Sequence, residues 1–226
     1  MKRSLILLTV LAGIVAAQTR PVADPVALAD QLKAALQAGD VEAAIRLNNQ
    51  IGLALYKQRQ ASIPTPAATL ASLEQTLPAS GQTRFYGLAN VAKAAFDAGD
   101  YNKAETYARE LLAAVPVNGK DWNYGNAIFY GNMVIGRVAL ARDKNVSLAK
   151  SSLLASAQSK GSPQLNSFGP NMSLAKDLIA AGERDTVVEF FALCKTFWLP
   201  QFAKLDEWSA LVKNGGTPNF GANLLY

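Results

Sequence analysis

Histidine is absent from this 226-residue sequence, and Cys194 is its only cysteine. Without histidine, the common Ser-His-Asp and Cys-His arrangements of nucleophilic catalysis cannot form, and no imidazole can bind a metal. A single cysteine supplies neither an internal disulfide nor a thiolate cluster. No Gly-x-Gly-x-x-Gly or Walker-type phosphate loop occurs either. These absences predict a protein with no metal, no cofactor and no enzymatic activity.

Pairs of carboxylates are the remaining route to catalysis, because glycoside hydrolysis needs two acids across one sugar. The acids that lie close in sequence are Glu183 with Asp185, Glu189, and Asp206 with Glu207. The first two crowd an expected helix start, where acids favour the helix dipole, and the last two are typical of a solvated face. Lytic transglycosylases place their catalytic Glu directly before a Ser, and no Glu-Ser dipeptide occurs. A glycan-binding or hydrolytic protein is therefore the least favoured alternative.

Long apolar runs are also lacking, apart from residues 5–15. This run is shorter than the about 20 residues of a membrane span. A basic head, Met1-Lys2-Arg3, precedes it, and small residues follow at 15–17, which predicts a signal peptide over residues 1–17. The remaining chain has 20 basic and 17 acidic residues, a net charge of +3, and no Lys/Arg-rich run. We expect a periplasmic or secreted protein that has no membrane span after cleavage and binds no nucleic acid.

Segments that alternate apolar and polar residues with period two, as exposed strands do, are absent too. The chain instead repeats apolar or Ala positions spaced three and four apart, interrupted by short turns. In each turn a Gly or polar residue closes one helix, and an acid or amide suits the start of the next. Four turns share this pattern: residues 38–41, 98–101, 143–146 and 181–184. The pattern predicts an all-α fold of about four helix–turn–helix pairs.

The second pair is the clearest, and it resembles a known repeat. Residues 95–104 read Ala-Phe-Asp-Ala-Gly-Asp-Tyr-Asn-Lys-Ala, followed by Tyr-Ala-Arg-Glu-Leu-Leu and by Pro116. This run resembles a tetratricopeptide repeat (TPR). Two features depart from that family: Ala108 replaces its usual large aromatic, and its Trp-x-x-Leu-Gly opening is absent. The resemblance implies an α-solenoid, a TPR-like right-handed superhelix in which the first helix of each pair lines the concave side.

We expect the domain boundaries to follow these pairs. Residues 18–27 form a short N-terminal segment, 28–200 the TPR-like repeat domain, and 201–226 a C-terminal helix and capping tail. An extra helix is predicted near residues 67–77, and a loop over 161–170. The segment 161–178 is also similar to a run in uncharacterised exported bacterial repeat proteins, which implies a bacterial envelope or secreted protein.

Two polar stripes on the expected first helices are the candidate partner-binding surface. On the first helix of the second pair the polar positions recur at spacings of four, three and four, away from its apolar face. The next first helix has a comparable stripe. The proposed partner-binding residues are Tyr86, Asn90, Lys93, Asn123, Asn126, Tyr130 and Arg137, with Asp97 on the first stripe.

Amides and phenols can pair with a peptide backbone, and the two cations can receive a carboxylate. The sequence therefore predicts a scaffold for a protein or peptide partner. A solvated polar face is the plainer interpretation of the same stripes, and a structural subunit of an envelope assembly is the alternative function. The sequence does not indicate the oligomeric state.

The signal peptide gives the first testable prediction. The exported protein should begin at Gln18, because the basic head, the short apolar run and the small residues at 15–17 match the three parts of a cleaved signal. Intact mass spectrometry of exported material measures this directly. A chain that keeps Met1 would contradict the assigned compartment.

Overall fold

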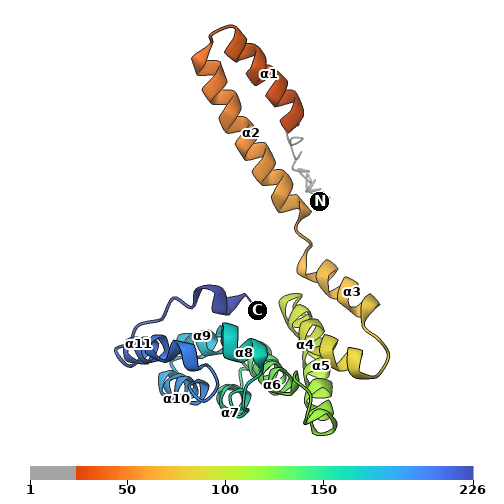
Figure 1. Cartoon of the computed structure of the whole chain (residues 1–226), viewed down its shortest axis with the longest axis vertical. Helices are drawn as coiled ribbons and strands as arrows, with labels where there is room; N and C mark the ends of the chain where they lie inside the picture. The colour runs from red at the N-terminus through yellow and green to blue at the C-terminus, as the bar shows by residue number, and fades with distance from the viewer. Residues whose placement is uncertain (1–23, 226) are drawn as a thin grey trace, which may run out of the picture. The chain divides into compact units, whose positions relative to one another are not determined.

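The computed structural model describes residues 24–225, all of whose regular structure is helical (Figure 1). No strand occurs in this range, so the predicted all-α class is confirmed. The expected signal peptide over residues 1–17 lies outside the described residues. Between residues 24 and 225, no helix combines the length and apolarity that a membrane span requires.

Two compact units make up the chain, and they divide between Ile63 and Pro64. The single repeat domain expected over 28–200 therefore contains a boundary near its start. Pro64 disfavours helical geometry at the preceding residue, and Ile63 is accordingly extended, with ψ 121°. Thr65 then begins the next helix by accepting a hydrogen bond from the Ala68 amide.

The first unit is a hairpin of α1 (Pro25–Gln37) and α2 (Val41–Ser62). Gly39 adopts φ 70° in the connecting turn, and the Asp40 carboxylate caps α2 by accepting from the Ala43 amide. The small core between the helices centres on Leu28, Leu47 and Ala54. Leu55, next to Ala54 in the chain, is 51% exposed.

The second unit contains the remaining nine α-helices of the described range. They are α3 (Pro66–Thr76), α4 (Gln82–Asp97), α5 (Tyr101–Ala114), α6 (Tyr124–Ala141), α7 (Val146–Ser156), α8 (Pro163–Phe168), α9 (Ser173–Ala180), α10 (Arg184–Cys194) and α11 (Phe202–Lys213). The extra helix expected near 67–77 is confirmed as α3. The loop expected over 161–170 is wrong, because Ser162 caps a short helix there by accepting from the Leu165 amide.

The pairs α4–α5, α6–α7 and α9–α10 follow one another, and each packs internally. The first helices also meet, because α4 packs on α6 and α6 on α9. Small residues permit this closeness. Ala104 and Ala108 of α5 are fully buried, and a Cβ added to Gly131 of α6 would lie 3.3 Å from the Ala108 carbonyl oxygen. A large aromatic at position 108 would not fit against a backbone this near.

The C-terminal tail packs back onto the last helices. The buried Phe220 ring lies 5.0 Å from the Trp208 ring and 6.2 Å from the Phe191 ring, centroid to centroid. The Asn223 side chain donates to the carbonyl oxygens of Phe168 and Pro170. The apolar ends of α10 and α11 are thereby covered.

Cys194 lies within this packed region, at the end of α10, and is buried. Burial raises the pKa of its thiol well above the ordinary value, because desolvation penalises the thiolate. The thiol is therefore a core side chain and a poor nucleophile.

The close approach at the start of α6 gives a prediction on stability. A Cβ at Gly125 would lie 1.8 Å from the carbonyl oxygen of Gly161, a backbone atom that cannot move aside cheaply. Gly125→Ala should therefore cost about 1–3 kcal/mol of unfolding free energy, or more. All three tryptophans lie in the second unit, so their fluorescence during denaturation reports on that unit.

Gly119→Ala is the matched control. Gly119 has φ −61°, and its added Cβ would meet nothing nearer than 3.7 Å. This substitution should leave stability unchanged or slightly raised, because alanine restricts the unfolded chain. Equal losses from both substitutions would show that the contact at Gly125 is not tight.

Candidate functional site

The proposed partner-binding residues lie on α4, on α6 and just before α6. Tyr86, Asn90 and Lys93 are on α4, and Asn126, Tyr130 and Arg137 are on α6. Asn123 immediately precedes the first residue of α6. Helix α4 packs against α6. Lys93 contacts the Tyr130 ring and lines the same pocket as Asn90, whereas the others take separate roles.

An open pocket of about 380 Å³ lies between α3 and α4. The α4 side is polar, and the α3 side is largely apolar. Its lining residues are Pro64, Pro66, Thr69, Leu73, Asn90, Lys93, Ala94 and Asp97. We call it the α3–α4 groove. The helix α3 was predicted from sequence, but its place as the wall of this groove was not.

Lys93 is the most unusual residue of the groove. Its Nζ lies 4.4 Å from the centre of the Tyr130 ring, a cation–π contact that joins α4 to α6. Burial lowers the pKa of the Lys93 ammonium below its ordinary value, and the nearby charge of Asp97 opposes that shift. Among residues 24–225, no carboxylate lies close enough to form an ion pair with Lys93. A partly desolvated cation therefore borders an open groove.

Arg137 lines a second pocket, of about 480 Å³, formed by parts of α4, α6, α7 and α9. Its guanidinium carbon lies 4.1 Å from the centre of the Phe96 ring, and its Nε donates to Asp177 Oδ2 at 3.0 Å. The side chains of Lys144 and Val146 also line the hollow, which is mainly apolar. Arg137 is thus fixed in place between the first helices of three successive pairs.

Asn123 and Asn126 do not lie on an exposed stripe, and this part of the prediction is wrong. Both are buried, with 6% and 7% of their surface exposed. Asn126 Nδ2 donates to Asn123 Oδ1 at 2.8 Å and to Gln164 Oε1 at 3.1 Å, while Ser162 Oγ donates to Asn126 Oδ1 at 2.6 Å. Residues 162–164 cover the start of α6, where an open loop was expected. Asn126 therefore binds the α8 segment, and Asn123 supports Asn126, rather than either offering an exposed surface to a partner.

Tyr86 also has an internal role. Its hydroxyl donates to Asp121 Oδ2 at 2.8 Å, and its ring lies 5.2 Å from the Trp122 ring. The hydrogen bond to the Asp121 carboxylate raises the pKa of Tyr86, because ionisation would place two negative charges together. Gln82 donates to the same carboxylate oxygen. Tyr86 thus fastens the start of α4 to the segment that precedes α6.

Phe96 and Asp177 are the site residues that sequence reasoning missed. Phe96 was noted only as part of the run 95–104, and its half-buried ring supports Arg137. Asp177 was not singled out at all. Both lie on first helices of successive pairs, as does Arg137, and that recurrence on equivalent helices is the signal that could have found them.

Two of the acids considered for hydrolysis form ion pairs. Glu183 Oε2 accepts from Lys150 Nζ at 2.5 Å, and Asp206 forms an ion pair with Lys195. Within residues 24–225, no group of three His, Cys, Asp or Glu side chains could hold a metal ion. The residues of α4 and α6 place two cations on aromatic rings, and one of these cations lies beside an amide and an apolar wall.

Comparisons with known proteins do not assign this chain to a family. No protein-family model, no curated protein and no solved structure matches the chain. The resemblance to tetratricopeptide repeats therefore remains a prediction from the pattern of residues 85–116. The site is interpreted from its own contacts.

The partial burial of Lys93 gives a prediction that needs no ligand. Lys93→Met keeps the length of the side chain and removes the desolvated charge, so the second unit should be no less stable than the parent. Loss of the contact with the Tyr130 ring opposes this gain by about 0.5–1 kcal/mol. Thermal unfolding followed by tryptophan fluorescence measures the balance, with Lys176→Met, at an exposed position of α9, as the control. A marked loss of stability in Lys93→Met alone would show that Lys93 is structural.

Proposed function

We propose that this chain is an exported bacterial scaffold whose helix pairs form a TPR-like array that binds a protein or peptide partner. The mutual contacts of α4, α6 and α9 support a solenoid, since the first helices of such repeats line one continuous face. The predicted signal peptide supports a periplasmic or secreted location. No catalytic step is proposed.

The environment of Lys93 is the observation that carries this proposal. An ammonium that is partly buried, rests on the Tyr130 ring and has no ion pair within the described residues costs free energy to maintain. A carboxylate that entered the α3–α4 groove would offset that cost by forming a charge-assisted hydrogen bond. A residue kept for packing alone would be better apolar.

The rest of the groove fits an extended peptide. The exposed Asn90 lies one helical turn before Lys93, and its amide has both a donor and an acceptor for a peptide backbone. Pro66 and Leu73 of α3 offer an apolar wall for a side chain of the peptide. We infer that the preferred ligand is an extended segment with an acidic side chain or a C-terminal carboxylate next to an apolar residue.

A library of fluorescent peptides tests this function. Peptides that combine an acidic and an apolar residue should bind the chain, and Lys93→Met should weaken that binding about tenfold or more, because hydrogen bonds to charged groups contribute about 1.5–3 kcal/mol. Fluorescence polarisation provides the dissociation constants. Binding should also weaken as the pH rises through the lowered pKa of Lys93, since the neutral amine cannot pair with a carboxylate.

Two controls accompany the measurement. Lys176→Met should bind as the parent does, because Lys176 is exposed on α9 and lines neither the groove nor the Arg137 pocket. Replacing the peptide's Glu by Gln should weaken its binding to the parent as much as Lys93→Met does. The same replacement should not weaken binding to Lys93→Met any further. Equal affinities for the Glu and Gln peptides would exclude Lys93 as the recognising group.

A further inference from the structure

Helix α2 carries apolar side chains on two opposite faces, and α1 covers only one of them. The covered face holds Leu47 and Ala54. At about 100° per residue, Ile45 lies roughly opposite that face, and positions 41, 49, 52 and 56 continue its stripe. The apolar residues on or beside this uncovered stripe are between 51% and 68% exposed: Val41, Ile45, Leu53, Leu55 and Tyr56.

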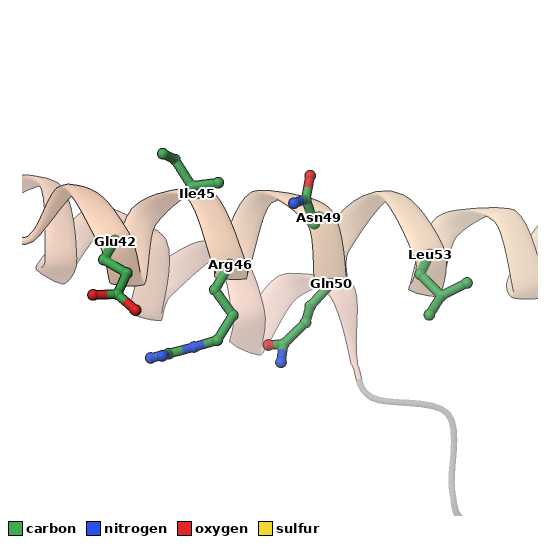
Figure 2. A pocket seen from close by; sticks show the side chains of 6 residues that line it. All are labelled: Glu42, Ile45, Arg46, Asn49, Gln50 and Leu53. Atoms are coloured by element: carbon green, nitrogen blue, oxygen red, sulfur yellow. The ribbon is translucent and has the colours of Figure 1, made fainter.

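The uncovered face is also hollowed. An open pocket of about 480 Å³ is lined by six residues, all of them from α2: Glu42, Ile45, Arg46, Asn49, Gln50 and Leu53. Figure 2 shows Ile45 and Asn49 pointing to one side of the helix, and Arg46 and Gln50 to the other. A hollow between two rows of side chains is the shape that receives a row from a second helix.

We propose that α2 pairs with α2 of a second copy of this chain, antiparallel and about a two-fold axis at Asn49. Ile45 and Leu53 are each four residues from Asn49, on either side. An antiparallel pair centred there places Ile45 of each copy against Leu53 of the other. The same contact thus occurs twice, as an isologous interface requires. Asn49 meets Asn49 on the axis, and a central asparagine in an apolar seam fixes the register of paired helices.

Charge complementarity favours the antiparallel direction. Glu42 and Lys57 lie on the same side of the stripe, seven residues before and eight residues after Asn49. The antiparallel pair therefore sets Glu42 of each copy beside Lys57 of the other. In a parallel pair these charges would be 15 positions apart along the axis, about 22 Å, and could not meet.

Within the described residues, the hairpin leaves part of α2 uncovered. Helix α1 has 13 residues and α2 has 22, so α1 cannot cover α2 along its whole length. The core that the described residues of this unit form, centred on Leu28, Leu47 and Ala54, is small, and a second apolar surface would add to it. A second copy of the chain carries the same apolar stripe, so this pairing needs no other protein.

The assembly state of the purified chain tests the pairing. Analytical ultracentrifugation from about 1 µM to about 300 µM, the range in which weak interfaces dissociate, should show a dimer that dissociates on dilution. Ile45→Asp with Leu53→Asp should weaken the dimer at least tenfold, because it places carboxylates against one another. Val117→Asp is the control, because Val117 is an apolar residue that is 86% exposed in the second unit. This substitution should leave the dimer unchanged. A chain that is monomeric at every concentration overturns the proposal, and so does a dimer that survives the double substitution.

Exchanging the charges of Glu42 and Lys57 tests the register without changing the apolar seam. This test therefore remains informative even if Ile45→Asp with Leu53→Asp unfolds the hairpin. Glu42→Lys and Lys57→Glu should each weaken the dimer several-fold, and the two changes combined in one chain should restore it. Failure of the combined variant to recover overturns the antiparallel arrangement. Circular dichroism confirms that each variant keeps its helices.

Cysteine cross-linking places the axis. Asn49→Cys should form a disulfide-linked dimer on mild oxidation, whereas Asn214→Cys, at an exposed position of the second unit, should not. Cys194 does not interfere, because it is buried. Equal cross-linking at both positions would show random collision and would overturn the assignment of Asn49 to the axis.

Discussion

The second unit depends on the close approach of its neighbours to α6. Three glycines of this helix each meet a different segment: Gly125 the backbone of Gly161, Gly131 the Leu112 side chain of α5, and Gly136 Leu174 of α9. A Cβ atom at any of these three glycines would lie within 2.7 Å of an atom of the segment that it meets. Helix α6 also contacts α4, so its position determines where Tyr130 and Arg137 lie. Tyr130 is the aromatic partner of Lys93, and Arg137 is the cationic partner of Phe96.

The sequence predicted the helices better than it predicted what covers them. The turns at Gly39-Asp40 and Gly99-Asp100 and the helix near 67–77 are local signals, carried by glycine conformation, acidic caps and proline, and all three are confirmed. The burial of Asn123 and Asn126 depends instead on contacts with residues near position 163, about forty positions along the chain. Periodicity cannot detect such a contact, because a buried amide network and a solvated polar stripe have the same spacing. The α3 wall of the groove was missed for the same reason.

The polar face of α4 and α6 contrasts with the alanine-rich contacts behind it. Ala104 and Ala108 meet no water, and the fully buried Leu111 completes the same stripe of α5. On the other side of α4, a lysine is kept partly desolvated on a tyrosine ring, and an arginine is held by a phenylalanine and an aspartate. Replacing partly buried charged groups by apolar ones of similar volume is often neutral or stabilising, so these polar contacts are not explained by stability alone.

Pairing through α2 would change how the proposed groove binds its partner. Each dimer would carry two α3–α4 grooves, each joined to the shared hairpins by Ile63-Pro64-Thr65-Pro66, a connection whose two prolines restrict its backbone. A short and restricted connection keeps the second groove at a high effective concentration once the first is occupied, provided that the partner offers two segments at a matching distance. A weak interaction at each Lys93 would then be enough for firm attachment to a repetitive or oligomeric partner. A partner with one segment would bind each groove independently and gain nothing from the dimer.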